Sequence, residues 1–262
     1  NDFMRSQKRL ATFWAVVMFL AALATVPANA AVTVAPGEME MKTDWLQKNL
    51  LAPARTPPFS FTFGGKFSAA LLRSWKRVDA RRILDANRTE RVITWTDAAS
   101  GLVVKCVAVE YSDYPVVEWT VYLKNSSPRN TPILQDIKGL NTSFHRKHGP
   151  EFILNGNKGD FTTEDSYEPY RVTLAPNSIK TCAPFYYSGK SSDGPDGWPY
   201  YNLQLPDGGV ILAIGWPGQW ESSFTRDAAD GLNLQAGQQL TRLLLQPGET
   251  IRTPLIALLF WQ

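Results

Sequence analysis

A succession of short alternating runs, from Phe59 to the end of the chain, limits the fold more than any other feature of the sequence. The clearest run is Val116 to Asn125, in which every second residue from Val117 to Leu123 is apolar and the residues between them are polar or amphipathic. Side chains of an extended strand point alternately to its two faces. This run therefore predicts a half-buried β-strand.

Similar runs occupy most of the remaining chain. Arg91 to Thr96 and Leu102 to Tyr111 precede the first run, and turn residues separate all three, which predicts an antiparallel meander. Residues 145 to 206 are richer in Gly, Ser and Asp, so we expect long loops there. Further runs are Val210 to Trp216, Leu232 to Ala236, Gln239 to Gln246 and Ile251 to Trp261. Strands at this spacing predict an all-β fold, a large antiparallel β-sandwich or supersandwich.

Residues 1 to 30 have the three parts of a secretory signal peptide. Arg5, Lys8 and Arg9 form a basic region, and an apolar stretch from Leu10 to Leu23 follows. Ala28-Asn29-Ala30 then resembles a cleavage site with small residues at both ends. About 14 apolar residues are too few for a comfortable membrane span, which needs about 20. An uncleaved anchor is the alternative. We expect export to the periplasm or the extracellular space, with a mature chain that begins at Ala31.

A lead-in segment, residues 31 to 57, separates the signal peptide from the sandwich, which we expect to span residues 58 to 262. Thr43 to Leu51 is a short candidate helix in this segment, with Asp44 as its cap. Cys106 and Cys182 are the two cysteines of the chain. A disulfide is allowed in an exported protein, but Cys106 lies in an apolar run and is expected to be a thiol of the core.

The charge of the chain argues against nucleic acid and against an anionic membrane as partners. The formal net charge is +3, and outside residues 1 to 30 there are 24 basic and 23 acidic residues. A basic patch that binds phosphates needs a larger excess. Nine Trp and nine Tyr accompany only 19% charged residues, a balance that fits a sugar-binding protein or an ordinary sandwich core.

No common catalytic or cofactor motif occurs in the sequence. The chain has no HExxH, GxSxG, GxGxxG, P-loop or paired CxxC pattern, so we expect no cofactor and no metal site. His145 and His148 flank two basic residues and are expected to lie in a solvated turn. Asp193 and Asp196 lack the spacing of a calcium-binding loop.

Two polar segments contain candidate substrate-binding residues. Trp216, Gln219 and Trp220 lie in a run with Pro and Gly, so the two indoles and the amide could contact a sugar ring and its hydroxyls. Both Trp side chains could equally fill the core. Trp216 continues an apolar run and is expected to point inward, which leaves Trp220 at the loop surface. Asp160 ends the polar, Gly-containing loop expected from Asn155 to Asp160 and could accept hydrogen bonds from two hydroxyls, or simply close a turn.

Residues spread over two hundred positions resemble one family, the N-terminal domain of glycoside hydrolase family 36 α-galactosidases (melibiases). The resemblance covers roughly Pro58 to Trp261. The matching stretches are Pro58 to Phe61, Gly64-Gly65, Leu71-Leu72, Trp75-Lys76, Trp95 to Asp97, Gly101-Leu102, Glu110-Tyr111, Tyr114 to Trp119, Thr131 to Leu134, Gly159 to Phe161, Tyr201-Asn202, Ala213 to Trp220 and Thr253 to Ile256.

The resemblance implies an accessory domain and not a catalyst. In that family a large N-terminal sandwich precedes a (β/α)8 barrel, whose two aspartates perform a retaining hydrolysis. The barrel is missing from this sequence, so the chain alone is expected to be inactive and to hold no catalytic residue. Its expected partners are an α-galactoside-type oligosaccharide, its own C-terminal barrel and a second copy of the chain. A free-standing carbohydrate-binding module and a structural or oligomerisation sandwich are the alternatives.

The signal peptide yields a direct prediction. If residues 1 to 30 direct export, expression in a bacterial host should give an exported protein whose N-terminal residue is Ala31. Intact-mass analysis of the exported fraction measures this. Retention of residues 1 to 30 in that fraction would contradict the assignment, and replacing Ala28 and Ala30 by bulky residues serves as the control that blocks cleavage.

Overall fold

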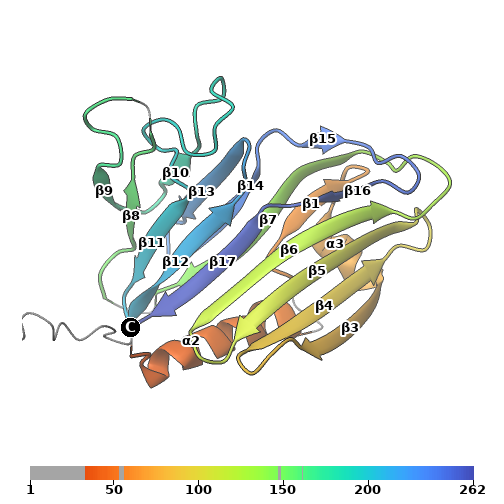
Figure 1. Cartoon of the computed structure of the whole chain (residues 1–262), viewed down its shortest axis with the longest axis horizontal. Coiled ribbons are helices and arrows are strands. Elements are labelled where there is room, and N and C mark those ends of the chain that lie inside the picture. The colour runs from red at the N-terminus through yellow and green to blue at the C-terminus, as the bar shows by residue number, and fades with distance from the viewer. Residues whose placement is uncertain (1–32, 53–55, 147–148, 161) are drawn as a thin grey trace, which may run out of the picture. The chain divides into compact units, whose positions relative to one another are not determined.

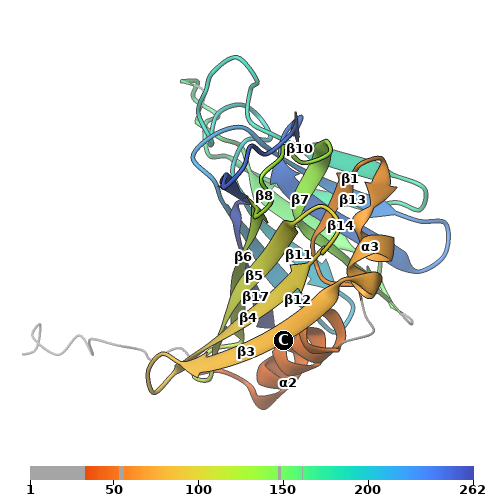
Figure 2. The same cartoon turned by 90° about the vertical axis from the view of Figure 1, so that its right-hand side faces the viewer.

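The computed structural model describes residues 33–52, 56–146, 149–160 and 162–262. The expected signal peptide, His148 and the last residue of the Gly159 to Phe161 stretch lie outside these residues. Residues from Val34 to Gln262 form one compact unit. Two antiparallel sheets, of seven and ten strands in the described part, pack face to face in this unit, as Figures 1 and 2 show. The expected mostly-β sandwich is confirmed.

The ten-stranded sheet has the order β3-β4-β5-β6-β17-β12-β11-β8-β9, and β16 pairs with β6. Its strands are β3 (Lys76–Ile83), β4 (Arg88–Thr96), β5 (Leu102–Tyr111), β6 (Val116–Asn125), β8 (Ile153–Asn157), β9 (Pro169–Thr173), β11 (Tyr200–Leu205), β12 (Gly208–Gly215), β16 (Thr250–Arg252) and β17 (Leu255–Trp261).

The seven-stranded sheet has the order β10-β13-β14-β7-β1-β2, and β15 pairs with β7. Its strands are β1 (Ser60–Phe63), β2 (Lys66–Phe67), β7 (Leu134–His145), β10 (Ile179–Cys182), β13 (Trp220–Arg226), β14 (Gly231–Gln238) and β15 (Arg242–Leu243). The helices are α2 (Pro36–Leu46), its π-helical continuation η1 (Gln47–Leu51) and α3 (Ser68–Ser74), which lies beside β1 in Figure 2.

The predicted meander is β4, β5 and β6, which pair antiparallel in that order. β5 and β6 have the bounds expected from the sequence. Elsewhere the strands differ. The run Gln239 to Gln246 forms only the two residues of β15, and the run Ile251 to Trp261 divides into β16 and β17 at Thr253-Pro254. Proline has no N–H for the ladder, which explains the break. The segment expected to consist mainly of loops holds β8, β9, β10 and β11.

The expected lead-in segment contributes helical residues to the sandwich core. α2 begins at Pro36, seven residues before the expected Thr43, so Asp44 lies inside the helix and the assignment of Asp44 as its cap is wrong. Proline suits the first turn because its missing N–H would have no partner there. The Glu38 carboxylate accepts the N–H of Ala35 at 3.0 Å and completes the start of the helix.

Trp119 joins α2 to both sheets at the centre of the core. Its indole N–H donates to the Gly139 carbonyl of the opposite sheet at 2.8 Å. The Trp45 ring of α2 stacks on it, with centroids 5.3 Å apart. The predicted inward face of β6 is confirmed, because Trp119 is 1% exposed and the other apolar residues of that face are equally buried.

Both cysteines are free and buried, Cys106 in β5 and Cys182 in β10, which belong to different sheets. Burial raises the pKa of the Cys106 thiol to about 12. The expectation of a core thiol is confirmed for Cys106. Within the described ranges, no helix has the length and apolar content needed to cross a membrane.

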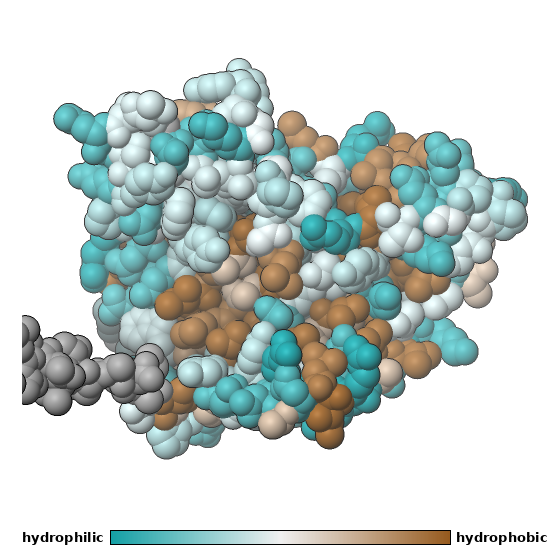
Figure 3. Space-filling model, in the orientation of Figure 1, coloured by the Kyte–Doolittle hydropathy of each residue, from teal (hydrophilic) through white to brown (hydrophobic). Residues whose placement is uncertain are grey.

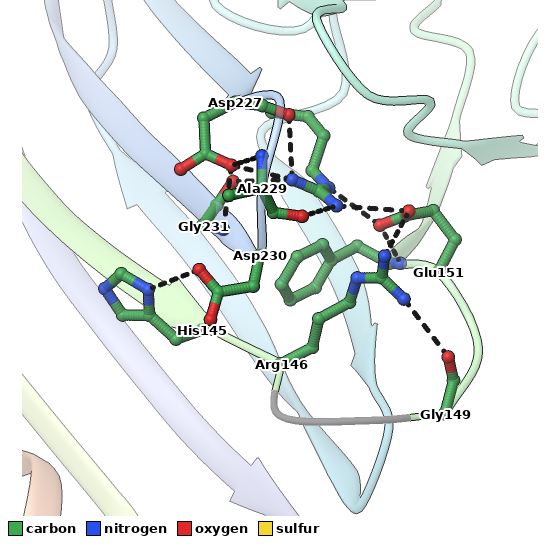
Figure 4. A network of polar contacts seen from close by, with 10 residues as sticks. His145, Arg146, Gly149, Glu151, Asp227, Ala229, Asp230 and Gly231 are labelled. Atoms are coloured by element: carbon green, nitrogen blue, oxygen red, sulfur yellow. Dashed lines mark hydrogen bonds and ion pairs between the residues drawn. The ribbon is translucent and has the colours of Figure 1, made fainter.

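A buried arginine closes one end of the seven-stranded sheet. Arg226 is 1% exposed, and its Nε and Nη2 atoms donate to the two Glu151 carboxylate oxygens at 2.8 and 3.3 Å (Figure 4). Nη1 donates to Asp227 Oδ1 at 2.8 Å, and Nη2 also donates to the Ala229 carbonyl at 2.8 Å. Arg146 reaches Glu151 from the other side at 3.3 Å. The guanidinium is thus fully occupied within the protein, and its role is structural.

This cluster makes stability depend on pH in a defined direction. The hydrogen bond from Arg226 lowers the pKa of Glu151, so the carboxylate stabilises the fold above the ordinary glutamate pKa, and this stabilisation is lost as the pH falls through the lowered value. Glu151→Gln should therefore cost about 1 to 3 kcal/mol at neutral pH. Urea unfolding of the purified chain at several pH values measures the difference.

The exposed Glu40→Gln is the matched control, and its stability should follow that of the unmodified protein at every pH. The difference for Glu151→Gln should shrink in acid, where the wild-type carboxyl is also protonated. A difference that stays constant down to the acid transition would contradict the role of the Glu151 charge.

Candidate functional site

The long loop of residues 183–199 connects β10 to β11 and so passes from one sheet to the other (Figure 1). On one side the start of the β8–β9 loop holds it. The Gly159 N–H donates to the Gly194 carbonyl at 2.8 Å, and the Asp160 N–H donates to the Ser192 carbonyl at 2.7 Å. A Cβ on Gly159 would lie 2.5 Å from the Ser192 oxygen, so only glycine allows this contact.

On the other side the turn between β12 and β13 holds the same loop. The Gln219 amide donates from Nε2 to the Phe185 carbonyl at 2.9 Å, and the Trp220 indole donates from Nε1 to the Ser191 carbonyl at 2.7 Å. Asp160, Gln219 and Trp220 therefore lie around one loop, as a shared site requires. They hold the loop by its main chain.

Trp220 is fully buried, and the expectation that it lies at the loop surface is wrong. Its ring is 0% exposed and meets the ring of Tyr201 at 6.3 Å in the core. The reason is that β13 begins at Trp220 itself, so the side chain starts an inward-facing row that continues through Ser222 and Phe224. A saccharide cannot stack on a ring without exposed surface.

Trp216 is half-buried, and the expectation that it turns inward is only partly met. The ring packs against the edge of the core, and the Arg252 guanidinium lies over it at 5.0 Å from the ring centroid. Such a stacked cation covers one face of the indole. Trp216 thus has exposed surface, unlike Trp220.

Gln219 keeps an atom that no described residue satisfies, whereas the Asp160 carboxylate has partners. It accepts a long 3.4 Å bond from the Thr162 N–H, which is the geometry of a turn, and a hydrogen bond from the Tyr167 hydroxyl. The Gln219 Oε1 atom is buried and has no hydrogen-bond partner in the described part of the chain. A buried hydrogen-bond acceptor without a donor lowers the stability of the folded protein.

A groove of about 470 Å³ opens on the outer face of the ten-stranded sheet, beside this loop. The Tyr170 side chain points to the inner face of the sheet, where a Cβ on Gly156 would come within 2.6 Å of its ring and where its hydroxyl lies 3.7 Å from the Cys182 sulfur of β10. The lining residues are Asn155, Gly156, Asn157, Pro169, Tyr170, Arg171, Tyr200, Tyr201, Asn202 and Ile211.

The groove side chains offer both donors and acceptors. Asn155 donates to the Asn202 carbonyl at 3.3 Å and Asn157 to the Tyr167 carbonyl at 3.0 Å, which leaves their side-chain oxygens as acceptors. The Asn202 side-chain oxygen accepts from the Trp261 indole at 2.9 Å, which turns its NH₂ group outward as a donor. The exposed Arg171 guanidinium has no hydrogen bond or ion pair with a described side chain. Sugar hydroxyls need such a mixed set.

A row of aromatic rings begins at Tyr200, which lines the groove, and continues to Trp198 and Tyr167, which lie beyond its lining. Tyr167 meets Trp198 edge-on at 5.5 Å, and Trp198 meets Tyr200 at 6.0 Å. Tyr167 and Tyr200 are each about half exposed. Burial, followed by a hydrogen bond to Asp160, raises the pKa of Tyr167 and keeps its hydroxyl protonated. Asp160 thus contacts this aromatic row through Tyr167.

The sequence did not identify the groove. Asn155 and Asn157 were assigned to a polar loop, but they lie in β8 and share its outer face. Their spacing of two residues was the one feature of the sequence that could have placed both side chains on the same face of a strand. Asn202 and Arg171 come beside Asn155 only through strand register, in which Asn155 pairs with both. Register of this kind is not readable from one sequence.

Within the described residues, no group of three or more His, Cys, Asp or Glu is placed to hold a metal. His145 is exposed and faces one carboxylate, with its Nδ1 atom 3.7 Å from Asp230 (Figure 4). Asp196 forms an ion pair with Lys180 at 2.7 Å. Four described carboxyl groups have a lowered pKa, each through hydrogen bonds: Asp85, Glu151, Asp165 and Asp227.

Solved structures resemble this chain in fold. No protein-family model and no curated protein matches the sequence. The α-galactosidase of Lactobacillus brevis matches with 15% identity and a TM-score of 0.59, over 79% of this chain and 29% of that one. A variant of the family 36 α-galactosidase AgaA of Geobacillus stearothermophilus, in complex with raffinose, matches with 17% identity and a TM-score of 0.57, over 79% and 30%.

The galactosidase domain of the α-galactosidase-sucrose kinase AgaSK matches with 15% identity and a TM-score of 0.55, again over 79% and 30%. Identities at this level establish the fold alone. The matched part of these enzymes is their N-terminal β-sandwich domain. The chain thus has the fold of that domain and spans about 30% of the length of the enzymes it matches.

The positions of the two tryptophans yield a prediction about stability. Trp220→Ala should cost about 3 to 5 kcal/mol, because it empties a fully packed site and leaves the Ser191 carbonyl without its donor. Trp216→Ala should cost only about 1 to 2 kcal/mol, because part of its surface is already exposed. Chemical unfolding of the two variants measures the difference, and equal losses would contradict it.

Proposed function

We propose that this chain is the N-terminal accessory domain of a secreted α-galactosidase-like glycoside hydrolase and contacts sugar without catalysing hydrolysis. The observation that carries the proposal is the fold match over 79% of the chain to about 30% of family 36 α-galactosidases. One of the matched enzymes is described in complex with raffinose and another variant with stachyose. Those enzymes bind these sugars through their catalytic domains, and the proposal is that this domain contacts the same class of ligand, an α-galactoside.

The groove beside loop 183–199 supports the contact with sugar. It combines an aromatic edge with amide donors and acceptors and an unpaired guanidinium, and its volume of about 470 Å³ falls in the range of small-ligand sites. Asp160 contacts the aromatic row beside this site through Tyr167, Gln219 positions the loop, and Trp216 adds exposed indole surface near the loop. Trp220 supports the loop from the core.

The proposed partner is a C-terminal catalytic barrel, with the outer face of the ten-stranded sheet as its docking surface. Hydrophobic residues gather over the middle of this face in Figure 3. Two groups of half-buried apolar residues contribute to this surface, with Thr120 and Glu118 of β6 between them: Val92 with Val107, and Val116 with Leu259, Ala257 and Ala213. Apolar groups rimmed by polar residues are typical of an interface. A second copy of the chain is an alternative occupant.

A free-standing carbohydrate-binding module is the second candidate function. It is favoured by the groove itself, whose lining combines amide, guanidinium and aromatic side chains. Such a module would bind sugar with full affinity without a barrel. The accessory domain would supply only part of the contacts and bind the isolated sugar weakly. Export through residues 1 to 30 is proposed in both cases.

The proposal predicts sugar binding without turnover. The purified chain should bind raffinose in the groove and should not hydrolyse an aryl α-galactoside. Heteronuclear NMR titration with raffinose locates the contact, and a release assay measures turnover. Hydrolysis by the pure chain would contradict the proposed division of labour, and the absence of any raffinose-dependent shift at the groove would contradict the contact.

Tyr200→Ala tests the groove directly, because Tyr200 is 51% exposed and its loss should not disturb the core. Raffinose affinity should fall about fivefold, which corresponds to about 1 kcal/mol for an aromatic contact. Tyr114→Ala is the matched control, since Tyr114 is 45% exposed and lies in the turn between β5 and β6. Equal affinities of the two variants would remove Tyr200 from the site.

A further inference from the structure

A second groove, of about 530 Å³, lies where α3 and the β1–β2 hairpin meet the loops that follow β4 and β6. We call it the corner groove. It shares no lining residue with the groove beside loop 183–199. Its lining residues are Phe63, Gly64, Lys66, Leu71, Trp75, Asp97, Ala99, Ser100, Ser127, Arg129, Asn130 and Pro132.

One wall of the corner groove is apolar and aromatic. Trp75 is half-buried, and the rings of Phe61 and Phe63 pack behind it, with centroids 6.3 and 6.1 Å away. Leu71 of α3 completes this wall. An indole held in this way by neighbouring rings offers a fixed surface to a ligand ring.

The opposite wall is rigid before any ligand binds. Asn125 is 0% exposed, and its amide donates to the Arg129 carbonyl at 2.7 Å while its Oδ1 atom accepts the Ser127 N–H at 2.9 Å. Gly101 packs closely against this loop, because a Cβ at this position would lie 2.8 Å from Ser127 Cβ. A preformed wall lowers the entropy that binding costs.

The charges of the corner groove are unbalanced. Lys66 and Arg129 are exposed and form no ion pair or side-chain hydrogen bond with the described residues. Asp97 is occupied, because its carboxylate accepts the Ser100 hydroxyl at 2.6 Å and two N–H groups of its own turn. Two free cations therefore face a groove whose only carboxylate is already used by the protein, which favours an anionic ligand.

We propose that the corner groove binds an anionic saccharide, with a pyranose ring against Trp75 and its carboxylate or sulfate group neutralised by Lys66 and Arg129. The hydroxyl and amide groups of Ser127 and Asn130 line the same groove and match sugar hydroxyls. The ring surface favours a saccharide over an acidic peptide, which would need only the charges. The site is independent of the proposed α-galactoside contact.

The test is calorimetric titration of the full chain at low salt with three oligosaccharides of equal length: an oligogalacturonate, a sulfated galactan fragment and a neutral galactan fragment. At least one of the anionic probes should bind, and more tightly than the neutral one. The double variant Lys66→Gln with Arg129→Gln should bind that probe at least about tenfold more weakly, because each lost charge-assisted hydrogen bond lowers affinity severalfold. Trp75→Phe should also weaken binding while keeping an aromatic ring in the wall.

Arg81→Gln with Lys48→Gln is the matched control, since it removes one exposed Arg and one exposed Lys that line neither groove and should leave affinity unchanged. The proposal is overturned if the neutral probe binds as tightly as the anionic ones, if neither anionic probe binds, or if the control variant loses as much affinity. If poly-aspartate binds as tightly as the anionic saccharide, the ligand class is an acidic peptide and the proposal is overturned. Raffinose binding at the other groove should be the same in all of these variants, so the two proposals fail separately.

Discussion

The hydrogen bond from the Trp119 indole to the Gly139 carbonyl is the contact on which the arrangement of the sandwich depends. It joins the two sheets between two buried residues, and it satisfies the one polar atom of a large buried ring. The stacked Trp45 ring then places α2 across the end of the sheets. Lys42 of α2 donates to the Tyr111 carbonyl, so one helix closes the core and also fixes the end of β5.

The polar side chains at the two grooves fall into two sets. One set forms hydrogen bonds within the protein, and the other set is free to contact a ligand. Around loop 183–199 the buried donors of Gln219 and Trp220 are used for the fold, and the free groups are amides and one guanidinium on the outer face of the sheet. In the corner groove Asn125 and Asp97 are used for the fold, and two cations remain. The grooves therefore differ in how strongly they favour a negative ligand, because one cation lines the first groove and two line the corner groove.

The sequence predicted the fold well where alternation was regular. β5 and β6 are central strands with clean alternation, and their bounds match the prediction. The sequence did not predict β13, because its inward row includes the polar residues Ser222 and Arg226, which interrupt the alternation of apolar and polar residues. For this reason Trp220 was expected to be exposed. The groove was missed for another reason: Asn155, Asn202 and Arg171 meet only through register between strands that are distant in sequence.

The anchoring of loop 183–199 has a consequence for how such a domain diversifies. The loop is held by hydrogen bonds to its carbonyl oxygens, which every amino acid has. The donors are Asp160, Gln219 and Trp220. Substitutions at exposed positions of the loop, such as Tyr186 and Tyr187, leave these anchors in place. The loop can thus accumulate new side chains while its path stays the same, and a library confined to those exposed positions would alter ligand preference on an unchanged scaffold.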